Sequence, residues 1–249
     1  MNAAAIPKDV ATFRGWEYAR QGDYHRNIDP NWSYTPTYLQ KLAYVDAFVE
    51  TLPPDAAIVD VGCGEGVLVE KYAAQGRHIT GIDLNYESRW VRRGDVRCLP
   101  FADESVDALF FLDALEHLDY VHQPKALKEM RRVLRPGGRL LLSVPNLAHL
   151  NSRFRMFFKG ALDRTDTETN HIGERPIWEN TKIIRQAGFA IRRIEGITLT
   201  LPVVYRRMIC KRAAKLRWLH DLLEPIARRW PGAAMLTLYT LEKESAGTQ

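Results

Sequence analysis

A short apolar run followed by closely spaced glycines constrains the fold of this chain more than any other stretch. The run is Ile58–Val61, and Gly62, Gly64 and Gly66 follow it directly before a helical pattern at residues 67–74. This order predicts a buried strand, a tight turn and a helix whose first N–H groups a ligand can approach without meeting a Cβ atom. The segment is therefore predicted to form a ligand-binding corner of an α/β fold.

The spacing and charge of this corner indicate the kind of ligand. Dinucleotide-binding turns carry G-x-G-x-x-G and face a pyrophosphate, whereas this chain has G-x-G-x-G. The Asp60 carboxylate just before the turn would repel a pyrophosphate and favour an ammonium or a sulfonium group. A second predicted strand, 78–83, ends at Asp83, which follows Gly62 by 21 residues. Because an acid roughly 20 residues on commonly meets a ribose, the corner is predicted to bind a cationic nucleoside.

Three later segments extend the pattern to a family resemblance. They are Gly94-Asp95-Val96, residues 112–117 and residues 133–138, each at a predicted strand end or turn. With the glycine turn they resemble the ordered motifs of class I S-adenosylmethionine (SAM) dependent methyltransferases of type 11 or 23, with a more distant similarity to ubiquinone-biosynthesis O-methyltransferases. The resemblance covers about residues 56–146. It implies SAM as cofactor and a Rossmann-like, seven-stranded sheet of order 3-2-1-4-5-7-6 with an antiparallel seventh strand and helices on both faces.

The resemblance also implies where the cofactor is held. We expect Asp60, Gly62 and Gly64 at the methionine end of SAM and Asp83 at its ribose. Asp95 and Val96 are expected at the adenine, and the backbone of Leu112 against the cofactor. Cys63 and Leu84, beside these residues, are expected to bind the cofactor as well.

The alternation of strand and helix patterns from residue 56 independently predicts a parallel sheet wrapped by helices. Strands are expected at 58–61, 78–83, 91–96, 106–112, 139–144, 189–194 and 234–241, and helices at 38–49, 67–74, 124–134, 147–158, 177–186 and 203–229. We expect residues 1–50 to form an N-terminal flap and helix packed on the core. Residues 51–249 should form the methyltransferase domain, with acceptor-side insertions at about 147–175 and 200–232. The aromatic side chains of 1–34 suit either a substrate lid or simple packing on the core.

Two histidines are candidate bases for methylating a hydroxyl group. Methyl transfer from a sulfonium is an in-line displacement, so the protein mainly aligns the reactants and removes a proton. His117 lies just beyond the fourth strand, where ligands meet open α/β sheets, although a structural or cofactor-side role explains it equally well. His171 follows a polar segment after strand five and resembles a histidine of ubiquinone-type O-methyltransferases; a solvated loop histidine is the alternative.

A metal site is a weaker alternative at the same place. Asp113, Glu116 and His117 would share one face of a short helix, and two carboxylates with an imidazole can bind a divalent cation. An acidic helix start explains these residues without any ion. We therefore expect no metal.

Basic and apolar residues alternate in 153–159 and in 206–219, after the cofactor motifs. The basic 203–229 region suits either peripheral contact with an anionic membrane or a helix that caps the sheet with a solvated basic side. Nucleic acid is not expected, because the aromatics form no evident stacking series. The cysteines have no paired spacing, the start does not resemble a leader peptide, and no apolar run reaches 18 residues. We therefore expect a cytoplasmic protein, which would be peripheral at the inner membrane face if the basic region contacts the membrane.

The sequence therefore predicts a SAM-dependent methyltransferase that methylates oxygen of a small-molecule, lipid-linked or sugar-linked acceptor. A non-catalytic SAM-binding regulatory or partner subunit is the alternative from another class. A nucleotide-binding oxidoreductase is disfavoured by Asp60 and by the short glycine spacing. No motif identifies the acceptor.

Overall fold

One mixed β-sheet organises the fold in the computed structural model, which describes residues 25–32, 34–164, 171–202, 204 and 214–244; in these ranges the sheet has seven strands. The strands are β1 (Ile58–Val61), β2 (Ile79–Asp83), β3 (Val91–Arg93), β4 (Val106–Leu112), β5 (Leu134–Pro145), β6 (Phe189–Leu199) and β7 (Ala234–Lys243). Their spatial order is β3-β2-β1-β4-β5-β7-β6. β7 runs antiparallel to both β5 and β6, while the other neighbouring pairs are parallel. The predicted α/β fold and strand order are confirmed.

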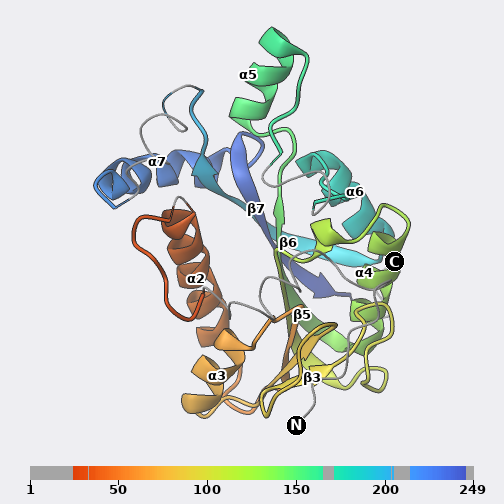
Figure 1. Ribbon diagram of the computed structural model, residues 1–249. Coiled ribbons are helices and arrows are strands. Elements are labelled where there is room, and N and C mark those ends of the chain that lie inside the picture. Colours follow the sequence, from red (N-terminus) through yellow and green to blue (C-terminus); the bar gives the residue numbers. More distant parts are fainter. Residues whose placement is uncertain (1–24, 33, 165–170, 203, 205–213, 245–249) are drawn as a thin grey trace.

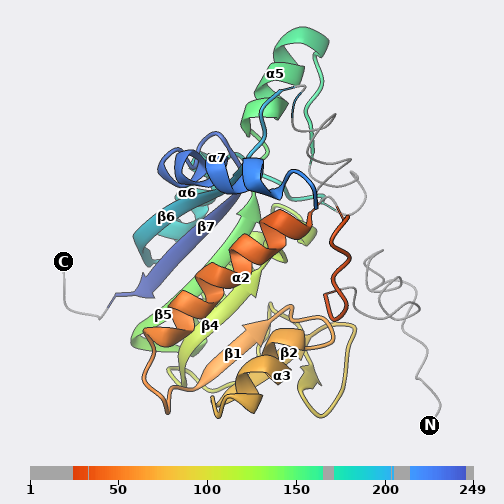
Figure 2. The ribbon, with the colours of Figure 1, turned by 90° about the vertical axis from the view of Figure 1, so that its left-hand side faces the viewer.

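Helices cover both faces of the sheet. They are α2 (Thr35–Glu50), α3 (Val67–Ala74), α4 (His122–Val133), α5 (Leu150–Lys159), α6 (Ile177–Gln186) and α7 (Arg217–Arg229), with one 3₁₀ turn, η1 (Leu115–His117). Figure 1 shows α2, α3 and α7 on one side of the sheet and α4 and α6 on the other. α5 projects beyond the end of the sheet in both ribbon views (Figures 1 and 2). Among the described residues, no helix combines the length and the apolar character needed to cross a bilayer.

The central strands β1 and β4 are mostly apolar because both of their faces are buried; Asp60 and Asp107 are the exceptions. Phe110 packs with α2 and α3 side chains such as Phe48 and Tyr72, whereas its neighbour Phe111 belongs to the opposite core, with Leu127 and Met130 of α4. This alternation follows from the two-residue period of a strand. The parallel pairing of β1 with β2 and with β4 brings their carboxyl ends to the same edge, where the predicted motif residues lie.

Asn146 joins the two ends of the segment that contains α5. Its Oδ1 accepts hydrogen bonds from Ala148 N–H (3.1 Å) and Ile177 N–H (3.2 Å). Its Nδ2 donates to the carbonyl oxygens of Gly232 (3.1 Å) and Ala234 (3.0 Å), beside β7. The single buried amide thus fixes where the chain leaves the sheet after β5 and where it returns before α6.

Most element boundaries match the sequence expectations, and the differences have local causes. β6 continues to Leu199 because it pairs with β7 along its full length, although Gly196 and Thr198 interrupt the apolar pattern there. α5 begins at Leu150 because the side chain of His149 accepts a hydrogen bond from Ser152 N–H and caps the helix. The helix expected at 203–229 begins only at Arg217 within the described residues, because residues 214–216 form a turn; residues 203 and 205–213 lie outside the description. Residues 1–24, most of the expected N-terminal flap, lie outside it too.

Candidate active site

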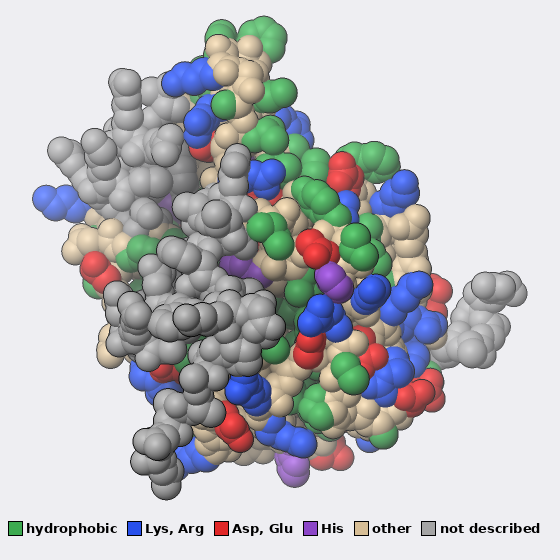
Figure 3. All heavy atoms as spheres, turned by 45° about the vertical axis from the view of Figure 1, so that its right-hand side comes forward, with side chains coloured by type: hydrophobic (Ala, Val, Ile, Leu, Met, Phe, Trp, Pro, Cys, Tyr) green, Lys and Arg blue, Asp and Glu red, His purple; other side chains and the backbone are tan. Residues whose placement is uncertain are grey.

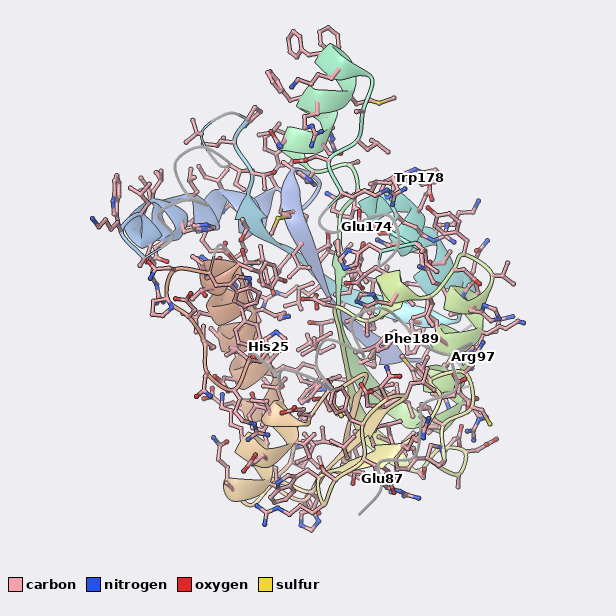
Figure 4. The ribbon with its side chains drawn as sticks, in the orientation of Figure 1. His25, Glu87, Arg97, Glu174, Trp178 and Phe189 are labelled. Atoms are coloured by element: carbon pink, nitrogen blue, oxygen red, sulfur yellow. The ribbon has the colours of Figure 1, made fainter. Side chains whose placement is uncertain are left out.

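A cavity of about 980 Å³ opens at the carboxyl edge of β1, β2 and β4. Its volume falls within the roughly 300–1,000 Å³ of small-molecule sites. In Figure 4, His25 beside α2 and Arg97 beyond β3 mark two sides of the cavity, and both line it. All the residues predicted for the cofactor line it as well: Asp60, Gly62, Cys63, Gly64, Asp83, Leu84, Asp95, Val96 and Leu112. The candidate residues Asp113, Glu116, His117 and His171 share the same cavity.

The glycine turn is fastened to the end of β2. Gly62 and Gly64 have φ values of 70° and 57°, in the left-handed region that favours glycine. Gly62 N–H donates to Ile82 O (2.7 Å) and Gly64 N–H to Asp83 Oδ2 (2.9 Å). A Cβ atom added at Gly62 would lie 2.9 Å from the Ala114 Cβ. The turn therefore has one conformation in which backbone, rather than side chain, faces the cavity.

Acidic groups give this part of the cavity its charge. Asp60 is buried at the end of β1, and burial, followed by the nearby Asp83 carboxylate, raises the pKa of Asp60 to about 8 against an opposing effect of Lys41. A cationic ligand would favour the ionised form of such a group. The carboxylates and the exposed glycine backbone thus fit a sulfonium-bearing nucleoside.

Asp95, on the expected adenine side, is already engaged by Arg97. The guanidinium Nε lies 2.9 Å from each Asp95 carboxylate oxygen, and Nη2 lies 2.5 Å from Oδ2. These side-chain bonds, more than any other cause, hold the pKa of Asp95 below its usual value. An adenine contact through Asp95 would therefore share the carboxylate with Arg97, which the sequence interpretation did not include.

The two candidate bases meet across the cavity wall. The rings of His117, in η1, and His171 pack edge to face with centroids 4.8 Å apart. His171 Nδ1 lies 2.7 Å from Glu174 Oε1, and both residues are buried. Sequence reasoning missed Glu174; its place three residues after His171 was the available signal. A buried histidine–carboxylate pair of this kind can orient a ring nitrogen towards a substrate.

Glu116 stands beside the two histidines. It is 2% exposed, and neither of its carboxylate oxygens has a hydrogen-bond partner among the described residues. Burial first, then the charges of Asp113 and Glu174, raise the pKa of Glu116 well above its usual value. One ligand atom from each of Glu116, His117 and His171 lies within 4.8 Å of the others. These three residues, and not the predicted Asp113–Glu116–His117 set, are the donors brought together.

Asp113 belongs to a separate network with the N-terminal part of the chain. Its Oδ2 accepts hydrogen bonds from Lys41 Nζ (2.5 Å) and the Tyr34 hydroxyl (2.8 Å), and Ser143 Oγ donates to its Oδ1 (2.5 Å). Burial alone would raise the pKa of Asp113, but the charge of Lys41 and these hydrogen bonds lower it. Asp113 has φ +50° and precedes η1. The short helix predicted to carry Asp113, Glu116 and His117 on one face is therefore wrong.

A second group of buried polar residues forms the wall near α5. His149 Nδ1 lies 2.7 Å from Thr200 Oγ1, and its Nε2 lies 2.9 Å from Asp163 O. Burial lowers the pKa of His149, against the opposing effect of its hydrogen bond to Asp163. Asn151 Nδ2 and Arg155 Nη1 both donate to the Asp163 carboxylate. His149, Asn151, Asp163 and Thr200 line the cavity, and none of them was a predicted site residue.

Comparison with known proteins agrees with this geometry. Residues 59–142 match the family model described as a methyltransferase domain. A "Probable S-adenosylmethionine-dependent methyltransferase" of Mycolicibacterium smegmatis is 31% identical over 150 residues, covering 56% of this chain and 54% of that protein. A ubiquinone biosynthesis O-methyltransferase of Idiomarina loihiensis is 34% identical over 102 residues, covering 36% and 42%. The chain spans about half the length of the curated relatives it matches.

Solved structures match over more of the chain and show the fold. The [4+2]-cyclase SpnF aligns with a TM-score of 0.55 at 22% identity, covering 82% of this chain and 81% of that chain. A Burkholderia thailandensis 1,6-didemethyltoxoflavin-N1-methyltransferase with bound S-adenosylhomocysteine aligns with a TM-score of 0.56 at 16% identity, covering 98% and 93%. These structures confirm the fold. The domain match and the sequence relatives confirm the predicted resemblance to class I SAM-dependent methyltransferases and, for this domain, SAM as the cofactor.

Proposed function

We propose that this protein transfers a methyl group from SAM to an oxygen atom of a small-molecule, lipid-linked or sugar-linked acceptor. The observation that supports the proposal is the position of the His171–Glu174 pair, whose histidine lines the same cavity as the glycine turn and its acidic residues. Residues 51–249 would form the methyltransferase domain, and residues 1–50 would cover it. α2 already contributes Lys41 to the cavity wall.

The cofactor side would align the donor. Bound SAM would supply an electrophilic methyl group on a positively charged sulfur. In this proposal Asp60 ionises beside the methionine end, Asp83 accepts hydrogen bonds from the ribose, and the backbone of Gly62 and Gly64 admits the ligand at close range. Asp95, Val96 and Leu112 would contact the rest of the nucleoside. None of these groups has to exchange a proton with the acceptor.

The acceptor side would supply the base. The Glu174 carboxylate would hold the His171 proton on Nδ1, so that Nε2 accepts the proton of the acceptor hydroxyl. The acceptor oxygen would then form a bond to the methyl carbon as the carbon–sulfur bond breaks, leaving a neutral thioether. His117 packs against the His171 ring and would fix its orientation. Glu116, kept protonated by burial, would donate a hydrogen bond to a second acceptor oxygen.

A turnover measurement tests this proposal. Protein is incubated with SAM labelled in the methyl group and an extract of small molecules and lipids, and the product is tested for O-methylation. His171→Gln should lower turnover by about 10²- to 10⁴-fold while SAM affinity, from isothermal titration, is unchanged. Absence of SAM binding by the wild-type protein would overturn the proposal. SAM binding without turnover on any acceptor would instead support the regulatory subunit.

Chelation separates base catalysis from a metal at Glu116, His117 and His171. These three donors would suit a divalent transition metal, so the same assay is run after dialysis against EDTA. Full activity supports the proton-transfer role. Activity lost on dialysis and restored by a divalent cation would replace it with metal binding.

A further inference from the structure

We propose that the protruding end of α5 docks on an anionic lipid surface. This end, here called the α5 tip, comprises Phe154, Met156, Phe157, Phe158 and Leu162. The inference concerns a surface outside the cavity and does not depend on the proposed reaction. It gives a role to apolar residues that the fold itself does not need at the tip.

The α5 tip exposes far more apolar surface than folding requires. Phe157 is 83% exposed and Phe158 65%. Phe158 stacks with Phe154 at 4.6 Å and with Phe157 at 4.9 Å between ring centroids, so the rings form one patch. Monomeric proteins seldom leave such a patch in water unless it binds something.

The shape of the tip suits insertion into a lipid surface better than a protein groove. α5 projects beyond the body of the protein (Figures 1 and 2), and its ten residues span roughly 15 Å. At 100° per residue, Phe154, Phe157 and Phe158 share one side, whereas Met156 points to the opposite side. A groove covers one side of a helix, but a lipid surface covers a tip on all sides. Interfacial segments enter to roughly 5–10 Å, so the last turns can insert while the body stays in water.

The charge around the tip favours anionic lipid. α5 contains Arg153, Arg155 and Lys159 and no acidic residue. Figure 3 shows Lys and Arg side chains beside the hydrophobic ones at this end of the molecule. Asp163 offsets the charge of Arg155. Arg153 donates to the carbonyls of Ala148 and Gly232, which leave its charge uncompensated and hold it below the tip. Basic groups just behind inserted aromatics are the arrangement that anionic headgroups attract.

α7 adds a second apolar surface at the same end. Trp218, Leu222 and Ile226 are exposed at four-residue spacing, and Arg229 projects from the same side. The bases of the two helices share a small core in which Leu150 of α5 packs with Ala227 of α7. The sequence suggested membrane contact for the basic region 203–229, which includes α7. The structure adds α5, whose aromatic side chains are more exposed.

The tip is mounted rigidly on the cavity wall. Asp163, on the chain returning from the tip, accepts hydrogen bonds from Asn151 and Arg155, and its N–H donates to Ser152 Oγ (3.0 Å). Asn151 and Asp163 both line the cavity. A docked tip would therefore hold this wall of the cavity next to the lipid surface.

Vesicle co-sedimentation tests the inference. Wild-type protein is spun with vesicles of phosphatidylcholine and phosphatidylglycerol, and with vesicles of phosphatidylcholine alone, at low and high salt. We expect pelleting with the anionic vesicles, weakened by salt and by omission of phosphatidylglycerol. The double variant Phe157→Ser/Phe158→Ser should lower partitioning by roughly 100-fold, about tenfold for each ring.

The control variant is Trp178→Ser, which removes a 65% exposed ring from α6 and should pellet like the wild type. SAM titration of each variant should match the wild type, which separates this test from the test of methyl transfer. Wild-type protein that stays in the supernatant, or a double variant that pellets fully, overturns the inference. The inference is also overturned if the wild type is a dimer that binds no vesicles and the double variant is a monomer, because the tip would then join two copies.

Discussion

The two walls of the cavity are built in different ways. The wall formed by the ends of β1, β2 and β4 is fixed by backbone: Gly62 and Gly64 donate to groups at the end of β2, only about 20 residues away. The opposite wall is fixed by side chains from separate segments, as in the contact of His149 with Thr200, 51 residues on. A backbone-built wall depends on local motifs, whereas a side-chain-built wall can change its chemistry without changing the fold. The first wall would therefore serve a common donor and the second a particular acceptor.

Substitution in the glycine turn tests the first wall most severely. In Gly62→Ala the new Cβ meets the Ala114 Cβ at 2.9 Å and the residue is held at φ +70°, so the turn must shift. The shift should displace the donor and lower turnover, roughly 100-fold for a displacement near 1 Å. Isothermal titration should also show weaker SAM binding. Gly76→Ala is the control, because φ is +81° there but nothing lies within 4 Å. The left-handed φ should cost each variant about 1 kcal/mol of stability, and Gly62→Ala should lose more because of its clash. Equal SAM affinities would show that the turn does not build the donor wall.

The Lys41–Asp113 pair joins α2 to the end of β4, between the two walls. Lys41→Met should destabilise the protein by about 2–3 kcal/mol, because it leaves a largely buried carboxylate without its cation. The pKa of Asp113 is lowered in the folded state, so the pair stabilises above the unfolded pKa of about 4 and this contribution is lost as pH falls below it. Urea unfolding should thus show a smaller wild-type-to-variant difference near pH 3 than near pH 7. Lys41→Met/Asp113→Asn should recover part of the loss; no recovery would contradict the pairing.

Glu174→Gln tests whether the second wall acts on the acceptor alone. The amide can still hold the His171 ring but cannot stabilise its protonated form, so turnover should fall roughly tenfold. SAM affinity should not change. The matched control is Glu179→Gln, a more exposed acid in the next helix that pairs with Arg175. A loss of SAM affinity in Glu174→Gln would mean that the two walls are not separate.

The last test is the pH dependence of donor binding. Burial raises the pKa of Asp60 to about 8, and a bound cation would lower it, so binding releases a proton below that pH. SAM affinity should therefore rise by up to about tenfold per pH unit towards pH 8 and level off above it. S-adenosylhomocysteine lacks the sulfonium and should show a shallower slope, and Asp60→Asn should flatten both. Titration calorimetry at several pH values gives the slopes; identical slopes for the two ligands would place the sulfonium away from Asp60.

The same contrast explains how much could be predicted from sequence. Strand and helix patterns predicted the parallel sheet and the boundaries of α3, α6 and β4, whereas the strand order came from the family resemblance. Every predicted cofactor residue lies on the cavity. Lys41 was missed because its partner, Asp113, is 72 residues away and no local pattern links them. Glu174 and Asp163 lie in irregular segments without periodicity. The predicted helix around Asp113 failed because Lys41, Tyr34 and Ser143 hold its carboxylate apart from Glu116 and His117.

Residues 147–176 begin and end at the same place. The Asn146 amide holds Ala148 and Ile177, and Leu147 N–H donates to Arg175 O, so this segment could be exchanged as a unit of different length and sequence that bridges the same short distance. The unit includes His171, Glu174, α5 and Asp163, while the glycine turn and its acids lie outside it. A graft of the corresponding segment from a relative, joined at Asn146 and Ile177, would change the acceptor wall and the protruding tip together in a single step. New acceptor specificity could then arise by replacement of one continuous piece of chain.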